Sequence, residues 1–116
     1  SGTMRARYKP SCCVAYQVPD HRKAVEFYSR VFGFPVVSET EENVELNASP
    51  VRLFIDQGPL LGPIMEIVVD NLETARVELL AHGCTEVRWD GPGKPCYLLD
   101  PFGICFNVWE DPKAFE

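Results

Sequence analysis

Hydrophobic and polar positions along the chain follow two periods, one typical of strands and one typical of helices. Residues 11–18 alternate, and one face of this predicted strand carries Cys12, Val14, Tyr16 and Val18. Asp20 is a suitable N-cap for a helix over residues 21–32, where apolar residues recur at helical spacing, and Gly33 suits its end. The side of this helix that we expect to pack against a sheet carries Val25, Phe27, Tyr28, Val31 and Phe32.

The same order of elements then occurs a second time. Further strands are predicted at 35–38, 43–47 and 51–56, after which the glycines and prolines of residues 58–63 interrupt regular structure. Beyond them the pattern predicts a strand at 64–69, a helix from Asp70-Asn71 to Gly83, and strands at 86–89, 95–99 and 104–109. We therefore predict an α+β fold, a single domain over residues 4–116 made of two βαβββ modules, residues 10–58 and 62–111.

Composition excludes several classes of protein. The 116 residues carry a formal net charge of −6, and such an acidic balance argues against nucleic-acid binding, which needs clustered Lys and Arg. No apolar run approaches the roughly 18 residues of a membrane helix, and no signal segment opens the chain. We expect a soluble cytoplasmic protein with neither nucleic-acid nor membrane partners, and we interpret Ser1-Gly2-Thr3 ahead of Met4 as a cloning remnant.

Five cysteines are present, and none is spaced as Cys-x-x-Cys. Reduced thiols that act as small hydrophobic residues are the default expectation without a secretory signal. Neither His21, near the start of the first helix, nor His82, near the end of the second, is expected beside a cysteine, so no basic group is predicted to activate a thiol. We assign no catalytic residue.

Three sequence segments resemble the vicinal oxygen chelate superfamily, which contains glyoxalase I, extradiol dioxygenases, and fosfomycin and bleomycin resistance proteins. They are Ala24-Val25-Glu26-Phe27-Tyr28, Phe32-Gly33-Phe34 and Asp100-Pro101-Phe102-Gly103. The resemblance implies that the two modules curl a mixed sheet into an open cup, and that short members of the superfamily form homodimers that complete two cups. It does not by itself assign an activity, because this fold carries many of them.

Enzymes of this superfamily hold a divalent metal in the cup with His, Gln and Glu side chains at four positions. Counted from the helix cap and from the Asp-Pro-Phe-Gly turn, these positions hold Cys13, Phe54, Ile64 and Asn107, or Pro63 instead of Ile64 if the register shifts by one residue. Phenylalanine and isoleucine have no donor atom, and a neutral amide is a poor substitute for a carboxylate. We expect no metal and no other cofactor.

Strand alternation predicts which side chains line the cup. If pairing across residues 100–103 is regular, Cys96 lies opposite Asn107 and Leu98 opposite Cys105. Met65, Ile67, Val69, Phe106 and Val108 are then expected on the helix side. The predicted ligand-binding residues are Cys13, Gln17, Phe54, Ile64, Glu66, Cys96, Asn107 and Trp109.

Each of the more informative side chains has an alternative interpretation. Trp109 could stack on a planar ligand, or belong to the core or a dimer interface. Glu66 could pair with a cationic group or be an exposed carboxylate at a strand edge, and Asn107 could contact a ligand or be a structural amide. We expect Trp89 near the surface.

The sequence thus favours a metal-free protein that binds a small organic molecule, a cationic or planar drug or metabolite, in the manner of bleomycin resistance proteins. A glyoxalase- or dioxygenase-like enzyme with displaced ligands, for example Glu66 and Cys13, is the alternative. A third possibility is an interaction module whose cup receives a partner's side chain.

Overall fold

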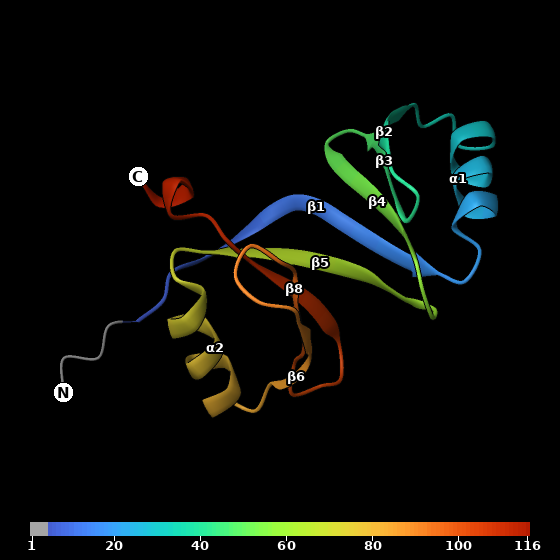
Figure 1. Cartoon of the computed structure of the whole chain (residues 1–116). Coiled ribbons are helices and arrows are strands. Elements are labelled where there is room, and N and C mark those ends of the chain that lie inside the picture. Colours follow the sequence, from blue (N-terminus) through green and yellow to red (C-terminus); the bar gives the residue numbers. More distant parts are fainter. Residues whose placement is uncertain (1–4) are drawn as a thin grey trace. The chain divides into compact units, whose positions relative to one another are not determined.

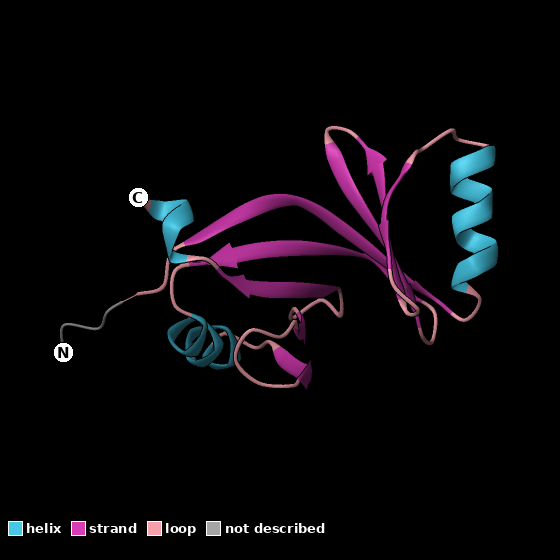
Figure 2. Ribbon diagram, turned by 45° about the horizontal axis from the view of Figure 1, so that its top comes forward, coloured by secondary structure: helices cyan, strands magenta, loops and turns pink. Residues whose placement is uncertain are grey.

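The computed structural model describes residues 5–116, so the segment interpreted as a cloning remnant lies outside the described part (Figures 1 and 2). Its elements are β1 (Tyr8–Val18), α1 (His21–Arg30), β2 (Val36–Glu39), β3 (Asn43–Ala48), β4 (Val51–Gln57), β5 (Leu61–Val69), α2 (Leu72–Ala81), β6 (Thr85–Trp89), β7 (Cys96–Leu99), β8 (Cys105–Glu110) and a 3-10 turn (Pro112–Phe115). This order confirms the α+β fold and the repeated strand, helix and three strands. No helix in residues 5–116 is long and apolar enough to cross a membrane.

The chain divides into two compact units. We call Cys12–Ile64 the N-terminal unit, and Met65–Glu116 together with residues 5–11 the C-terminal unit. The division falls within β1 and β5, so each of these strands contributes to both units.

In the N-terminal unit the strands lie in the order β2-β3-β4-β1, with β1 parallel to β4 and the other pairs antiparallel. Helix α1 covers one face of this sheet (Figure 1). Asp20 caps the helix, because its side chain accepts a hydrogen bond from the backbone N–H of Lys23 at 3.1 Å. The core beneath the helix consists of Val44, Leu46, Leu53 and Ile55, with Val14, Tyr16, Val18, Ala24, Val25 and Tyr28 packed against it.

The predicted burial of Phe27 is wrong, because this side chain is 47% exposed. Helix α1 ends at Arg30, and its sheet-facing stripe is narrower than predicted. Phe27 lies outside that stripe, with its ring centroid 5.4 Å from the exposed Phe32 and 5.2 Å from Tyr28. Phe27 therefore belongs to an aromatic cluster at the surface of the unit.

In the C-terminal unit the strands lie in the order β5-β8-β7-β6, with β5 parallel to β8. Helix α2 is capped by Asn71, whose side chain accepts from the N–H of Thr74 at 2.9 Å. The core of the C-terminal unit includes Val69, Leu72, Ala75, Cys96, Leu98 and Val108, with Ile67, Leu79, Trp89 and Phe106 packed against it. The helix side predicted for Ile67, Val69, Phe106 and Val108 is confirmed, whereas Met65 is 48% exposed.

The pairing of β7 with β8 differs from the prediction by one residue. Cys96 pairs with Val108 and Leu99 with Cys105. The reason lies in the connecting loop, where the Asp100 side chain accepts hydrogen bonds from the N–H groups of Phe102 and Ile104 and thereby draws Ile104 into the turn. A shift of one residue moves every side chain of a strand to the other face.

Candidate functional site

The eight predicted ligand-binding residues are shared between the two units. Those of the N-terminal unit are Cys13, Gln17, Phe54 and Ile64, and those of the C-terminal unit are Glu66, Cys96, Asn107 and Trp109.

In the N-terminal unit, Cys13, Gln17 and Phe54 share the sheet face that points away from α1. Cys13 pairs with Arg52, and Gln17 pairs with Asp56, two residues on either side of Phe54 along β4. Gln17 also donates from its amide nitrogen to the carbonyl of Pro59 at 2.8 Å, which fixes its side chain at the end of the strand. The structure therefore brings these three predicted residues onto one face.

A charged pair that the sequence interpretation missed occupies the same face. Arg52 donates to both carboxylate oxygens of Glu45 at 2.8 and 2.9 Å, and its guanidinium lies 5.4 Å from the ring centroid of Phe54. Glu45 is buried, and hydrogen bonding from Arg52 holds its pKa below the usual range. Alternation along β3 and β4 could have placed this pair on the face of Phe54, since Glu45 pairs directly with Phe54 and Arg52 lies two residues before it.

Ile64 differs from its predicted role. Its side chain is only 1% exposed, so it is a core residue rather than part of an open ligand-binding surface. Burial of this aliphatic side chain away from water stabilises the folded state.

In the C-terminal unit, three of the four predicted residues share one face. Glu66 pairs directly with Asn107, and Trp109 lies two positions further along β8. The Asn107 amide oxygen accepts from the backbone N–H of Cys96 at 2.9 Å, so this side chain ties β8 to the start of β7. The structural interpretation of Asn107 is the one that its hydrogen bond supports.

Cys96 lies on the opposite face, contrary to prediction. The one-residue shift between β7 and β8 places it in the core beside Val108, where it is fully buried. Burial also raises the pKa of the Cys96 thiol and that of Cys105, which keeps both thiols protonated at neutral pH. None of the five cysteines, all of which lie in the described part of the chain, forms a disulfide, and Cys12 is the exposed one.

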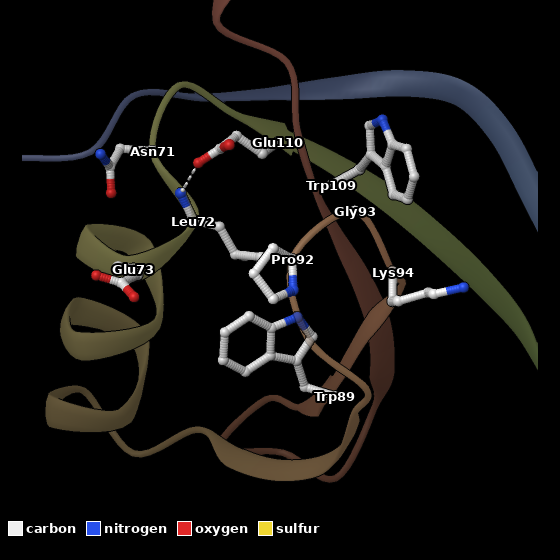
Figure 3. A pocket seen from close by; sticks show the side chains of 9 residues that line it. All are labelled: Asn71, Leu72, Glu73, Trp89, Pro92, Gly93, Lys94, Trp109 and Glu110. Carbon is white, nitrogen blue, oxygen red and sulfur yellow. Dashed lines mark hydrogen bonds between the residues drawn. The ribbon is translucent and has the colours of Figure 1, made fainter.

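The C-terminal unit has a cavity of about 320 Å³, and Trp109 is one of the residues that line it (Figure 3). It lies where α2 begins and where β6 and β8 end, beneath the loop of residues 92–94. Its lining residues are Asn71, Leu72, Glu73, Trp89, Pro92, Gly93, Lys94, Trp109 and Glu110. Of the eight predicted residues only Trp109 belongs to this set.

Both tryptophans of the chain line this cavity. Trp89 is half-buried rather than a surface residue, and the guanidinium of Arg76 lies 4.1 Å from its ring centroid. Its indole N–H is fully buried and has no hydrogen-bond acceptor within residues 5–116. In the view of Figure 3, Pro92 lies between Trp89 and Leu72, and all three side chains line the cavity.

The charged groups of the cavity give it an excess of one negative charge, from Glu73 and Glu110 against Lys94. Glu110 accepts from the backbone N–H of Leu72 at 2.8 Å, which satisfies one free donor at the start of α2. Figure 3 shows the Lys94 side chain extending away from Trp89 and Pro92. Two indoles and two carboxylates in one cavity suit a planar ligand that carries positive charge.

Metal-ligating groups do not gather in the described part of the chain. Within residues 5–116, no group of three or more His, Cys, Asp or Glu side chains lies close enough to hold a metal ion. The residues at the four metal-ligand positions implied by the resemblance do not fit a divalent cation, because Phe54 and Ile64 lack donor atoms and the Asn107 amide oxygen is engaged by Cys96.

Residues 13–109 match the family model of the glyoxalase-like domain. The chain belongs to this family. The glyoxalase-like domain is thereby placed in the vicinal oxygen chelate superfamily, as the helix and turn motifs predicted. No protein of curated function matches its sequence.

Solved structures share the fold of this glyoxalase-like domain. A hypothetical protein, BH1468 from Bacillus halodurans, superposes with a TM-score of 0.67 at 10% identity, over 90% of this chain and 94% of its own. The Mn(II)-bound glyoxalase from Novosphingobium aromaticivorans gives 0.65 at 21% identity, over 91% of this chain and 40% of its own. Homoprotocatechuate 2,3-dioxygenase from Brevibacterium fuscum superposes with a TM-score of 0.67 at 22% identity, over 92% of this chain and 38% of its own. The glyoxalase-like domain thus spans about two fifths of those two enzymes.

Proposed function

We propose that this glyoxalase-like domain is a metal-free protein that binds a small, planar, cationic organic molecule, and that the cavity between Trp89 and Trp109 receives it. The observation that carries the proposal is the pair of indoles with Glu73 and Glu110 in one cavity of about 320 Å³. Cavities for organic ligands start at about 300 Å³ and combine apolar walls with a few polar groups. A cytoplasmic role in sequestering a drug or metabolite, as bleomycin resistance proteins perform, is consistent with this chemistry.

The residues at the family's metal positions support binding without a metal. Cys13 and Asn107 are the two that carry donor atoms, and two donors that are neutral in their ordinary protonation states do not offset the dehydration of a divalent ion. Lewis-acid chemistry of the superfamily's usual kind would need ligands that these positions do not supply.

The aromatic walls explain how a ligand would be selected. Trp109 is 36% exposed and offers an indole face, whereas one face of Trp89 is already covered by Arg76. A cationic ring that stacks on an indole gains both apolar contact and cation–π attraction, worth about 0.5–2 kcal/mol for the latter. A neutral ring of the same shape gains the contact alone.

Fluorescence titration tests this proposal with a matched pair of probes. N-methylquinolinium, a planar cation, is added to the full chain, and neutral quinoline at pH 8 is the uncharged control. We expect saturable quenching of tryptophan emission, with tighter binding of the cation. The variants Trp109→Phe and Trp89→Phe identify which indole is quenched by the ligand. The variant Glu73→Gln tests whether the carboxylate charge of Glu73 contributes to binding.

Two results would contradict the proposal. One is quenching that rises linearly with probe and does not saturate. The other is equal affinity for quinoline and N-methylquinolinium, because a charge-blind site would not use Glu73 and Glu110. The expected Glu73→Gln effect is a loss of about 1 kcal/mol in affinity for the cation only.

A further inference from the structure

A second cavity, in the N-terminal unit, has no part in the function proposed above. Its volume is about 260 Å³, and it lies between the exposed flank of α1 and strands β2 and β3. Its lining residues are His21, Arg22, Val25, Glu26, Ser29, Glu39, Thr40 and Val44. The volume equals that of roughly nine water molecules at about 30 Å³ each, which suits a small metabolite rather than a drug-sized molecule.

His21 gives this cavity a fixed hydrogen-bond acceptor. The residue is only 7% exposed, and its Nδ1 lies 2.6 Å from the side-chain oxygen of Gln57. Gln57 is itself oriented, because its amide nitrogen donates to the carbonyl of Pro19. An amide oxygen only accepts, so Nδ1 carries the proton and Nε2 of the neutral ring is the acceptor.

Nε2 of His21 has no hydrogen-bond partner within residues 5–116, although the side chain lines the cavity. This nitrogen is not among the described buried polar atoms that lack a partner, so it is within reach of solvent at the cavity. It is therefore an accessible acceptor to which a ligand in the cavity can donate a hydrogen bond.

Two opposite charges line the same cavity without pairing. Arg22 and Glu39 form neither an ion pair nor a hydrogen bond with any described residue, and they do not bridge to one another. The other carboxylate of the cavity, Glu26, is 3.5 Å from Arg30, and the Thr40 hydroxyl is engaged by Asn43. The free groups are thus one guanidinium, one carboxylate and one imidazole nitrogen.

We propose that this cavity binds a small zwitterion, namely a free aliphatic α-amino acid. Arg22 offers the planar fork that fits a carboxylate. Glu39 and Nε2 of His21 accept hydrogen bonds from the ammonium group, which has three donors. Val25 and the buried Val44 supply an apolar surface for the aliphatic side chain.

Imidazole ¹⁵N NMR of the full chain tests the proposal, because the chain contains two histidines and one serves as the control. His82 is exposed, and its Nδ1 lies 2.8 Å from the carbonyl of Glu78, outside the cavity. The probe is L-valine, and its matched analogues are isobutylamine, which lacks the carboxylate, and 3-methylbutyrate, which lacks the ammonium. The variant His82→Gln assigns the signals.

We expect L-valine to shift the Nε2 signal of His21 saturably while His82 stays unchanged. Each analogue should bind at least about tenfold more weakly, since it loses one charge-assisted contact. Glu39→Gln and Arg22→Gln should each weaken L-valine binding by a similar factor, and Glu41→Gln, a neighbouring exposed carboxylate that does not line the cavity, should leave it unchanged.

Absence of a saturable His21 shift with L-valine would overturn the proposal. Equal affinity for L-valine and isobutylamine would do so too, because the site would then recognise an amine and not a zwitterion. Quenching of tryptophan by N-methylquinolinium should be the same with and without L-valine, so the two proposed sites succeed or fail separately.

Discussion

Asn107 illustrates, at the scale of single residues, how this chain differs from the metal enzymes that share its fold. In the metal enzymes of the superfamily that this chain resembles, a glutamate ligand is expected at this position. Here the Asn107 amide oxygen accepts a hydrogen bond from the backbone N–H of Cys96. An amide suits this role, because a carboxylate there would leave a negative charge next to the buried start of β7. Residue identity at the four implied metal positions is therefore what argues against a divalent cation in this chain.

Glu66, directly paired with Asn107 and half-buried, is the residue whose role stays a prediction. Glu66 does not line the cavity of Trp89 and Trp109, but its paired residue Asn107 lies two positions before Trp109 on the same sheet face. If the bound cation extends from Trp109 along this face to Glu66, Glu66→Gln should weaken N-methylquinolinium binding by about 1–3 kcal/mol, the range for a hydrogen bond to a charged group. Titration of this variant beside Glu73→Gln measures the difference. Unchanged affinity would remove Glu66 from the site and leave it a strand-edge carboxylate.

The Glu45–Arg52 pair predicts how stability depends on pH. Arg52 lowers the pKa of the buried Glu45 carboxyl in the folded state below its unfolded value of about 4.3. The pair therefore contributes stability above that unfolded value, and the contribution is lost as pH falls through the folded pKa.

Glu45→Gln should lose about 1 kcal/mol at pH 7, because Arg52 is half-exposed and its attraction is screened. Urea denaturation at pH 7 and pH 3 measures this difference. The gap between wild type and variant should shrink on acidification, and a gap that stays constant would show that the carboxylate charge is not its source.

At the scale of elements, the narrow buried stripe of α1 decides which substitutions matter. Phe27 is 47% exposed, so Phe27→Ala should cost about 1 kcal/mol or less, far below the ~3–5 kcal/mol of a buried phenylalanine. Leu46→Ala, at a fully buried position in the same unit, is the matched control and should cost about 2–5 kcal/mol. Chemical denaturation compares them, and a Phe27 loss equal to that of Leu46 would contradict the helix orientation.

Periodicity predicted most elements because burial enforces it. Val14, Tyr16 and Val18 pack against the core that α1 covers, and Ile67 and Val69 belong to the core that α2 covers, as alternation required. The β7–β8 register was not predictable in this way, because Asp100 side-chain hydrogen bonds, and not hydrophobic pattern, set the loop length and move Cys96 to the other face.

The cavity of the C-terminal unit was predictable only in part. Trp109 could be assigned from strand alternation, but Trp89 meets it through tertiary packing of β6 and the loop of residues 92–94. The same limit applies to His21, whose Nδ1 contact with Gln57 joins residues 36 positions apart. Contacts of this kind depend on the fold and leave no local signal in the sequence.

At the scale of the whole molecule, the family model that matches residues 13–109 places this chain in the glyoxalase-like family, and the resemblance to the vicinal oxygen chelate superfamily implies a homodimer. We expect light scattering at micromolar concentration to give a mass of about twice the 13.1 kDa of one chain, as closed two-fold pairs are the commonest assemblies. A mass equal to one chain would contradict the dimer and leave the binding proposal for the C-terminal cavity unaffected.

The metal content of the purified full chain tests most directly whether the protein binds its ligand without a metal. The protein is incubated with zinc, manganese, nickel and iron(II) in turn, dialysed, and measured by elemental analysis and thermal unfolding. Since Phe54 and Ile64 supply no donors, we predict far less than one equivalent of any metal and a melting temperature that EDTA does not change. One equivalent of a metal that EDTA removes, with a fall in melting temperature, would contradict metal-free binding and favour an enzyme with displaced ligands.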